Sequence, residues 1–339
     1  MSAPEPPRTV LFINVSRIGD TILATPAVRA AARAWPQARV TFLGHPKRVE
    51  VVEHLPYLAA SGAIDKNRAR FRGWLGPRRW DLAFVLGFDK PLVAYALRAA
   101  SRVVAFRQDD ARLDAKLWRC VERPKFQSLH AAEIPLLLTA AAGASAAGLR
   151  LDYAVTPDEK RWARETLARR LPAQHRPLVG FQVASFPTKA FRDWPPEHFA
   201  ALAEKILARW RGAHIVLFGG DADAARTREL AERLAGRATS FAGELALRQS
   251  AALMSELDLY VGVDTGPTHI MGALEPPMIA LYHSHSPAWL LMPRERPGLH
   301  TVDHPRAGRD NRPEAPMAEI DVDTVWKKVE EALGARSFG

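Results

Sequence analysis

The sequence predicts an α/β protein built from two parallel-sheet domains. In both halves of the chain, short apolar runs typical of buried strands alternate with amphipathic stretches typical of helices. The length of 339 residues favours two domains, and 47% hydrophobic with 25% charged residues is an ordinary globular composition. We expect a first domain at 1–150, a second at 151–320, and a C-terminal helix and tail at 321–339 that packs back toward the first domain.

The first half begins with a lead of nine residues that contains three prolines and lacks the apolar core of a secretory signal. The run Ala140–Gly148 is rich in Ala, Gly and Ser, so we expect a helix end that passes into a linker. The expected strands are 10–15, 39–44, 81–88 and 102–106, and the expected helices are 19–34, 46–54, 91–100 and 129–142.

The second half repeats the alternation of strands and helices. Pro195 and Pro196, just inside the start of an amphipathic stretch, indicate a helix N-terminus. A final helix is expected at about 321–333. The expected strands are 177–182, 213–218, 258–263 and 277–281, and the other expected helices are 157–171, 195–209, 222–235, 247–256 and 266–274.

A strand-to-helix corner in the second half suits an anion. The apolar run 257–263 ends at Asp264-Thr265-Gly266-Pro267, and a helical pattern follows from Thr268. Such a corner directs free backbone N–H groups and the positive end of a helix dipole at one point. We therefore expect a phosphate site there. The alternative is that Asp264 or Thr265 is a simple helix cap, which accounts for the same sequence pattern.

A second corner lies near the N-terminus. The buried-strand pattern 10–15 runs into Ser16-Arg17-Ile18-Gly19-Asp20, and an amphipathic helix follows from Thr21. This places Asp20 at the mouth of a strand-to-helix turn, where open α/β sheets hold their reactive groups. The alternative is an acidic residue that only stabilises the first turn of a helix.

Composition excludes several classes of protein. No apolar run approaches the ~20 residues that cross a bilayer. Cys120 is the single cysteine, which rules out an internal disulfide and fits the reducing cytoplasm. No His/Cys spacing indicates a zinc site, and we expect no metal and no cofactor. The formal net charge of +10 favours acidic partners, of which nucleic acid is the weakest because no recognised nucleic-acid module is present.

One segment, 68–80, combines five arginines with Phe71, Trp74 and Trp80. It suits an anionic membrane surface or an acidic acceptor. A solvated loop ahead of the strand 81–88 is an equally good interpretation of this charge pattern.

Four ordered motifs together resemble glycosyltransferase family 9, the ADP-heptose:lipopolysaccharide heptosyltransferases and their relatives. They are the stretch 16–27, the block 180–199 with its Lys189 and Arg192, the segment 216–221, and the segment 258–269. The resemblance covers roughly residues 9–333. It implies the GT-B architecture, in which two Rossmann-like domains face each other across a cleft.

The resemblance also implies roles for particular residues. Asp20 matches the proposed catalytic base, and Asp221 matches an acidic position near the donor nucleoside. The phosphate-contacting lysine of the family lies two residues before Trp-Pro, where this chain has Arg192, so either Arg192 or Lys189 binds the diphosphate. The remaining donor-side matches are Asp264, Thr265, Gly266, Thr268 and His269, and Ser16, Arg17, Gly19 and Thr21 are expected on the acceptor side.

The chemistry of sugar transfer suits these residues. A leaving diphosphate can be neutralised by cations, amides and a helix dipole, and the acceptor hydroxyl loses a proton to a base. A single base without a second carboxylate nucleophile favours direct, inverting displacement. The expected donor is an ADP-sugar and the expected acceptor an acidic glycolipid or glycan, with the enzyme in the cytoplasm or peripheral on the cytoplasmic face of the inner membrane.

Some features leave alternatives open. His269 either donates to a phosphate or makes a buried hydrogen bond. His283 and His285 depart from the family pattern and lack a clear third metal ligand, so we expect them to line the donor pocket or its rim. Trp194 is expected to pack in the core.

Rival functions follow from the same sequence. A nicotinamide-dependent dehydrogenase is set aside because the first corner has one glycine instead of Gly-x-Gly-x-x-Gly. A transferase that uses another nucleotide-sugar or a protein acceptor, and a non-catalytic sugar-nucleotide binder, remain alternatives.

Overall fold

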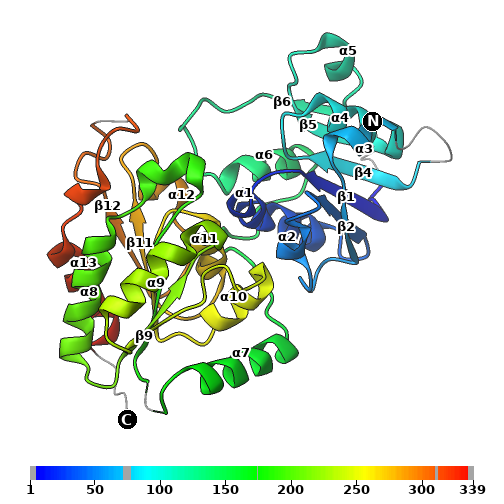
Figure 1. Ribbon diagram of the computed structural model, residues 1–339. Coiled ribbons are helices and arrows are strands. Elements are labelled where there is room, and N and C mark those ends of the chain that lie inside the picture. The colour runs from blue at the N-terminus through cyan, green and yellow to red at the C-terminus, as the bar shows by residue number, and fades with distance from the viewer. Residues whose placement is uncertain (1–4, 72–77, 174, 310–311, 335–339) are drawn as a thin grey trace. The chain divides into compact units, whose positions relative to one another are not determined.

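The computed structural model describes residues 5–71, 78–173, 175–309 and 312–334. The chain divides into two compact units, Met1–Ala154 and Val155–Gly339. Each unit contains one six-stranded parallel sheet with helices packed against it (Figure 1). The alternation expected from the sequence is therefore present in both halves.

The sheet of the first unit has the order β3-β2-β1-β4-β5-β6. Along β1, Val10 and Phe12 belong to a core cluster that contains Val28 of α2, whereas Leu11 and Ile13 belong to one that contains Val93 of α4. Helices therefore cover both faces of this sheet. The strands are β1 (Thr9–Asn14), β2 (Arg39–Gly44), β3 (Ala60–Ala63), β4 (Trp80–Val85), β5 (Ala100–Phe106) and β6 (Arg119–Val121), and the helices are α1 (Ile18–Leu23), α2 (Thr25–Ala34), α3 (Lys66–Phe71), α4 (Lys90–Ala99), α5 (Ala111–Asp114) and α6 (Glu133–Ala141).

Two local predictions for the first unit were wrong, and two of its strands were missed. The helix expected over 19–34 is two helices, because the chain restarts at Thr25 with Pro26 in the first turn of α2. The helix expected over 46–54 is only the 3-10 turn η1, Val49–Val52. The short strands β3 and β6 were not anticipated, since neither shows a clear alternating pattern.

The second unit has the sheet order β12-β11-β10-β7-β8-β9. Its edge strands β9 and β12 were also missed. The strands are β7 (Leu178–Gln182), β8 (His214–Phe218), β9 (Ala238–Ser240), β10 (Leu259–Val263), β11 (Met278–Tyr282) and β12 (Leu299–Asp303), and the helices are α7 (Pro157–Arg170), α8 (Pro196–Arg209), α9 (Ala224–Arg233), α10 (Leu247–Met254), α11 (Gly266–Ala273), α12 (Ala288–Leu291) and α13 (Val322–Leu333), with the 3-10 turns η2 (Pro187–Arg192), η3 (Asp221–Asp223) and η4 (Met317–Glu319).

The division between the units falls after Ala154, a few residues beyond the expected boundary. The linker is fastened to the first unit because the Arg29 guanidinium of α2 donates to the carbonyl of Arg150 (2.8 Å) and pairs with Asp152. The backbone N–H of Asp152 also donates to the Thr25 hydroxyl (3.0 Å). These bonds hold residues beyond 150 against α2.

The last helix, α13, completes the core of the second unit. Val325, Val329 and Leu333 are fully buried in the same cluster as the strands β7, β8, β10 and β11. Trp194 lies in this cluster as expected, and its indole N–H donates to the carbonyl of Ile320 (2.8 Å). The helix therefore belongs to the second unit, and its expected packing toward the first domain stays a prediction.

In both sheets the first strand of the unit is central and the chain changes direction beside it. β1 lies between β2 and β4, and β7 lies between β8 and β10. Ligands of open α/β sheets bind outside the carboxyl ends of the strands at such switch points. The corner that carries Asp20 follows β1, and the segments that carry Arg192 and Asp264 follow β7 and β10.

Candidate functional site

At the switch point of the second unit, Asp264 is the centre of a buried ion pair. Its carboxylate accepts from Nη1 of Arg192 at 2.5 Å, and His269 Nε2 lies 3.3 Å from its other oxygen. The Asp264 side chain is 2% exposed and that of Arg192 is 17% exposed. Burial alone raises the pKa of Asp264, but the bond from His269 and the charge of Arg192 outweigh it and hold this pKa below its ordinary value.

This arrangement refines what the sequence suggested for segment 264–269. The Asp264 carboxylate is occupied by Arg192 and His269. Thr265, half-buried, is the N-cap residue of α11, and its side chain makes no capping hydrogen bond. His269 takes the buried hydrogen-bonding role that the sequence allowed. The Arg192 guanidinium also donates to the Ser286 hydroxyl at 3.0 Å.

The amino end of α11 is held by a hydroxyl chain beneath it. The Thr268 hydroxyl donates to the carbonyl of Val263 (2.5 Å), so the Tyr260 hydroxyl, 2.8 Å away, donates to Thr268. Burial raises the pKa of Tyr260, which keeps this hydroxyl protonated. The Thr268 side chain is thus used internally, while the first-turn N–H groups of Gly266 and Thr268 have no helical acceptor.

Gly262 makes this hydroxyl chain possible. A Cβ atom at position 262 would lie 2.6 Å from the Tyr260 hydroxyl oxygen and 2.7 Å from its ring. The Tyr260 ring therefore passes over a position where only a glycine fits. Neither Tyr260 nor Gly262 was singled out from the sequence, because both read as ordinary residues of a buried strand.

Lys189 and Arg192 lie in the turn η2 but differ in their surroundings. The Lys189 ammonium is 5.5 Å from the centroid of the Phe191 ring and has no carboxylate partner among the described residues. Arg192, in contrast, is already paired with Asp264. Lys189 is therefore the cation of this turn whose charge is not neutralised by the protein.

An ionic network connects η2 with the corner after β8. The Arg226 guanidinium of α9 lies 3.1 Å from Asp193 and also pairs with Asp223. Asp193 accepts from the backbone N–H of Ser185 (2.7 Å), and Asp223 accepts from that of Gly220 (2.9 Å). Arg226 had no signal in the sequence, since a cation on a surface helix is common.

Asp221 follows β8 at the start of η3 and is exposed. Gly243, with a φ of +78°, lies close to it, and a Cβ at that glycine would be 3.2 Å from an Asp221 carboxylate oxygen. The positive φ and this close approach both favour glycine at 243. The Asp221 carboxylate is thus exposed to solvent and lies beside the backbone of Gly243, which has no side chain.

At the switch point of the first unit, Asp20 is exposed in the first turn of α1. Its Oδ2 accepts from the Ser16 hydroxyl (2.6 Å) and from the backbone N–H of Arg17 (3.3 Å). Within the described residues the other oxygen, Oδ1, makes no hydrogen bond. The carboxylate is therefore oriented through one oxygen and has the other available to a ligand.

The other residues expected on the acceptor side lie in the same corner. Arg17 is exposed, Gly19 is within α1, and the Thr21 hydroxyl is turned inward to the carbonyl of Arg17 at 2.8 Å. Arg48, which the sequence did not indicate, donates to the carbonyl of Ser16 at 3.0 Å.

The sequence analysis expected both histidines after β11 to line a pocket or its rim, but His283 lies in the protein interior. His283 is fully buried: its Nε2 donates to the carbonyl of Ala315 (2.8 Å) and its Nδ1 accepts from the N–H of His285 (2.9 Å). Burial lowers the pKa of His283, so the ring is neutral and structural. His285 is half-buried, and its ring lies 6.1 Å from that of Phe191.

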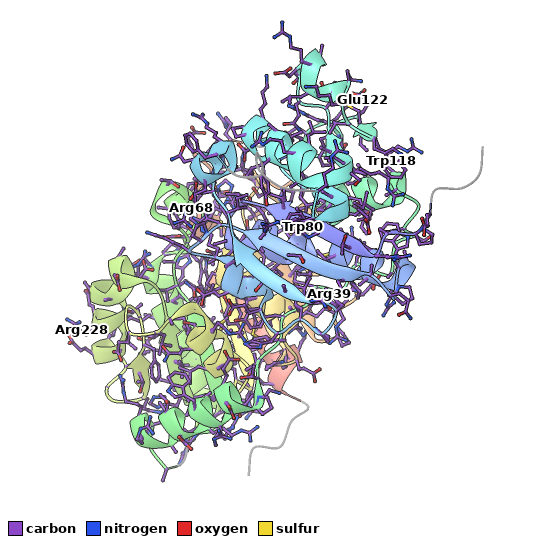
Figure 2. The ribbon with its side chains drawn as sticks, turned by 90° about the vertical axis from the view of Figure 1, so that its right-hand side faces the viewer. Arg39, Arg68, Trp80, Trp118, Glu122 and Arg228 are labelled. Atoms are coloured by element: carbon purple, nitrogen blue, oxygen red, sulfur yellow. The ribbon has the colours of Figure 1, made fainter. Side chains whose placement is uncertain are left out.

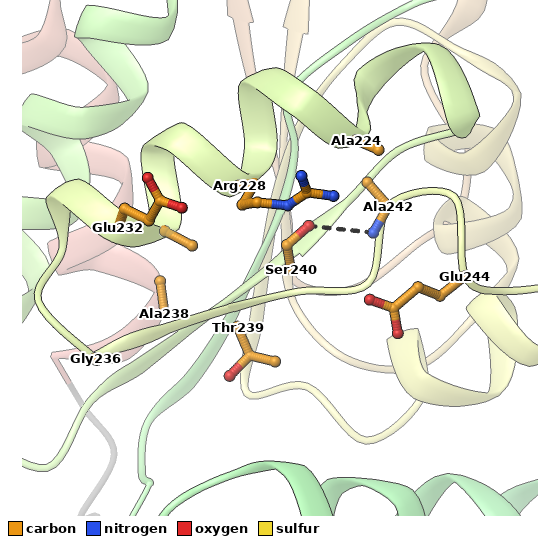
Figure 3. Close-up of a pocket in the computed structure, with 10 residues that line it drawn as sticks. Ala224, Arg228, Glu232, Gly236, Ala238, Thr239, Ser240, Ala242 and Glu244 are labelled. Atoms are coloured by element: carbon orange, nitrogen blue, oxygen red, sulfur yellow. Dashed lines mark hydrogen bonds between the residues drawn. The ribbon is translucent and has the colours of Figure 1, made fainter.

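A groove of about 410 Å³ lies between α9 and the edge strand β9 (Figure 3). Arg228, Glu232 and Glu244 contribute its charged lining. None of the residues singled out from the sequence lines this groove. Within the described residues, no group of three or more His, Cys, Asp or Glu side chains is arranged to hold a metal ion, and no helix is long and apolar enough to span a bilayer.

Comparison with known proteins identifies the family. The model of "Glycosyltransferase family 9 (heptosyltransferase)" matches residues 78–293, which is more than half of the chain. The chain belongs to glycosyltransferase family 9. The resemblance found in the four motifs is therefore confirmed, and the protein is a glycosyltransferase of the heptosyltransferase family.

Curated relatives of this family 9 enzyme cover most of its length. It is 27% identical over 307 residues to lipopolysaccharide heptosyltransferase 2 of Salmonella typhimurium, covering 82% of this chain and 83% of the relative. It is 24% identical over 282 residues to lipopolysaccharide heptosyltransferase 3 of Escherichia coli, covering 78% and 80%.

Solved structures confirm the fold class. A family 9 glycosyltransferase from Veillonella parvula has a TM-score of 0.82 at 19% identity, covering 97% of this chain and 98% of that one. The E. coli ADP-heptose lipopolysaccharide heptosyltransferase II has a TM-score of 0.79 at 21% identity, covering 96% and 98%. Two Rossmann-like sheets in the GT-B class are thus the fold of this family 9 chain.

Proposed function

We propose that this chain is an inverting, metal-independent glycosyltransferase that moves a heptose from an ADP-sugar to a lipopolysaccharide core or a related glycan. The relatives named for lipopolysaccharide heptosyl transfer support the acceptor class. A heptosyltransferase solved with ADP, with a TM-score of 0.71 and 20% identity, supports the donor class.

The second unit binds the donor in this proposal. The Lys189 ammonium and the free N–H groups at the start of α11 face the diphosphate, since both favour negative charge. The exposed Asp221 carboxylate accepts hydrogen bonds from ribose hydroxyls. Arg192 and Asp264 orient this arrangement from beneath as an ion pair.

Asp20 of the first unit acts as the general base. The acceptor hydroxyl oxygen forms a bond to the anomeric carbon while the bond from that carbon to the diphosphate oxygen breaks. The electron pair leaves with ADP, and the hydroxyl proton passes to the Asp20 carboxylate. A single displacement inverts the configuration, and the cation and amides of the second unit balance the charge of the departing ADP.

One observation carries this proposal. In this family 9 chain, the exposed Asp20 carboxylate, oriented by Ser16, follows β1 of the first sheet. In the second sheet, the Lys189 ammonium, unpaired within the described residues, follows β7, and the N-terminus of α11 follows β10. A non-catalytic sugar-nucleotide binder needs the cation and the helix N-terminus of the second unit, but it has no need of the Asp20 carboxylate.

The decisive experiment replaces Asp20 by Asn. The amide oxygen still accepts from Ser16 and from the N–H of Arg17, so folding and ADP affinity stay unchanged. Turnover of ADP-heptose with a lipopolysaccharide core acceptor falls by ~10²-fold or more, the size of a general-base contribution. Steady-state kinetics and calorimetric titration with ADP measure the two quantities.

Asp65→Asn is the matched control, because Asp65 also follows a strand of the first sheet and accepts from a first-turn N–H, that of Arg68 (2.7 Å). Normal turnover in the Asp20 variant would remove Asp20 as the base. A panel of nucleotide-sugars, with and without a chelator, tests donor choice and metal independence in the same assay.

A further inference from the structure

One aromatic ring, that of Phe191, contacts both cations of η2. The Lys189 ammonium lies 5.5 Å from the centroid of this ring, and the guanidinium carbon of Arg192 lies 5.6 Å from it. A cation within about 6 Å of a ring centroid is attracted to the negative face of the ring. Phe191 therefore contacts the cation that Asp264 neutralises and also Lys189, which has no carboxylate partner among the described residues.

Two imidazoles hold the Phe191 ring in place. The rings of His283 and His285 lie 5.1 and 6.1 Å from it and are nearly perpendicular to it, at 81° and 84°. Aromatic rings favour this edge-to-face geometry because of their quadrupoles. His283 is fully buried and bonded through both ring nitrogens, so it is a rigid support. The two histidines that depart from the family pattern thus meet at Phe191.

The backbone of Lys189 is also fixed. Its N–H donates to the carbonyl of Phe186 (2.7 Å), and its carbonyl oxygen lies 2.7 Å from the Ser185 hydroxyl. A φ of −130° at Lys189 interrupts the helical turn. The freedom that this residue retains is in its four-carbon side chain, which is half-buried and ends over the Phe191 ring.

An aromatic ring holds a lysine with a different consequence from a carboxylate. A carboxylate partner cancels the charge of the ammonium, whereas a ring attracts the ammonium and leaves its formal charge intact. A side chain that is already ordered also loses less rotamer entropy when it binds a ligand. Phe191 thus supplies order at Lys189 without neutralising it.

We propose that Phe191 is a positioning residue for sugar transfer, because it holds the Lys189 ammonium, with its charge intact, ready for the diphosphate of the donor. The inference rests on the proposed function, in which Lys189 binds that diphosphate. It adds a role for Phe191 and for its supports His283 and His285, to which the proposed reaction assigns none.

The test is a double-mutant cycle on ADP binding, measured by calorimetric titration. Phe191→Leu keeps the apolar bulk and removes the ring, and it is combined with Lys189→Ala. We expect Phe191→Leu to weaken ADP binding about three- to tenfold in the wild-type protein, the range of a cation–π contact, and to have no further effect in Lys189→Ala. Adenosine binds equally to all four proteins. Phe191→Tyr keeps the ring and retains the wild-type affinity for ADP.

Two control variants keep the chemistry and change its place. Arg228 of α9 is an exposed cation that extends from the surface of the second unit (Figure 2), so Phe191→Leu keeps its full effect when combined with Arg228→Ala. Phe88 of the first unit has the guanidinium carbon of Arg123 at 4.5 Å from its ring centroid and the Phe106 ring at 5.4 Å. Phe88→Leu therefore removes a similar contact and leaves ADP binding unchanged. Thermal unfolding checks that all variants are folded.

A second measurement needs no donor. A phenyl ring shifts the NMR signals of protons that lie over its face, so the ε-methylene protons of Lys189 are expected upfield of ordinary lysine signals in the ADP-free protein. The signal is identified by its absence in Lys189→Ala. It moves to the ordinary lysine position in Phe191→Leu and stays upfield in Phe191→Tyr.

An ordinary Lys189 signal in the wild-type protein would overturn the proposal, as would a wild-type affinity of Phe191→Leu for ADP. An equal loss of ADP affinity with and without Lys189 would also overturn it, because the ring would then act on the shape of the turn. Failure of the proposed function has a different signature, in which Lys189→Ala leaves ADP affinity unchanged while the upfield signal persists. The ring would then hold the ammonium, and the assignment of Lys189 to the diphosphate would be wrong.

Discussion

Two cations three positions apart in η2 have different electrostatic roles. The sequence left open whether Lys189 or Arg192 binds the diphosphate. The structure pairs Arg192 with the buried Asp264, whereas the Lys189 ammonium lies over the Phe191 ring and has no carboxylate partner among the described residues. A net positive charge is thus available at Lys189, and Arg192 with Asp264 forms a neutral pair.

Replacement of Lys189 by Ala is therefore expected to weaken ADP binding by about tenfold or more, the scale of a hydrogen bond to a charged group. The loss shrinks in high salt, because screening already weakens this contact in the wild-type protein. Adenosine, which has no phosphate, binds both proteins equally. Calorimetric titrations at two salt concentrations measure these effects.

Lys160→Ala, at an exposed lysine of α7, is the control for Lys189→Ala. A loss of adenosine affinity equal to that of ADP affinity would mean that Lys189 supports the shape of the site and does not bind the diphosphate.

Asp264 gives the site a defined response to acid. Because the pKa of Asp264 is lowered in the folded protein, its stabilising contribution is complete above the ordinary value of 3.8 and is lost as the pH falls through the folded value. Asp264→Asn leaves the Arg192 guanidinium buried without a counter-charge, which costs about 3 kcal/mol. Thermal unfolding of both proteins between pH 7 and pH 3 measures this difference.

The stability difference between wild type and Asp264→Asn is expected to be constant from neutral pH to about pH 5 and to shrink below the ordinary carboxyl range. A difference that already disappears between pH 7 and pH 5 would show that another group, such as the neighbouring His269, controls the ion pair.

At the scale of elements, α11 depends on the strand that precedes it. The hydroxyl chain from Tyr260 through Thr268 to the carbonyl of Val263 fixes the first turn of this helix over β10. The direction of the free N–H groups of Gly266 and Thr268 follows from that attachment. A change in the strand is thus transmitted to the amides that face the proposed diphosphate.

Gly262→Ala tests this coupling. The added methyl group would meet the Tyr260 hydroxyl at 2.6 Å and displace the ring, so the bond to Thr268 breaks. We expect a fall in stability of about 1–3 kcal/mol, as for overpacking of a core, and a weaker affinity for ADP. Urea unfolding and titration with ADP measure the two effects.

Gly87→Ala serves as the control, because a Cβ there has its nearest neighbour, an Asp89 carboxylate oxygen, at 3.8 Å. If Gly262→Ala lowered stability but left ADP affinity unchanged, the first turn of α11 would not contribute to donor binding.

Sequence patterns predicted the elements that position the candidate site and missed others for physical reasons. The strands at 10–15, 177–182 and 258–263 are buried on both faces, so they appear as continuous apolar runs. The edge strands β3, β6, β9 and β12 are partly exposed, and the first three are also short, which removes that signal.

The candidate site was predicted in part for a similar reason. Corner residues such as Asp20 and Asp264 could be predicted because each directly follows the end of a recognisable strand. Arg226 and Tyr260 act on the corners from elsewhere in the fold, and no local pattern distinguishes them from a surface cation or a buried strand residue. The pairing of Asp264 with Arg192, 72 positions away, likewise needs the fold to become visible.

At the scale of the whole molecule, charge and candidate chemistry are divided between two similar sheets. Both have six parallel strands with a central first strand, yet one unit carries the entire net charge and the other carries none. The shared fold therefore does not determine this difference. It arises from the residues that surround each sheet.

The exposed Cys120 in β6 acquires a practical meaning from this division. It is the single thiol of the chain and directly follows the exposed Arg119. A maleimide reagent would modify one position only, in the charged unit, without any engineered cysteine. The natural sequence thus already offers an attachment point for an optical probe in the first unit.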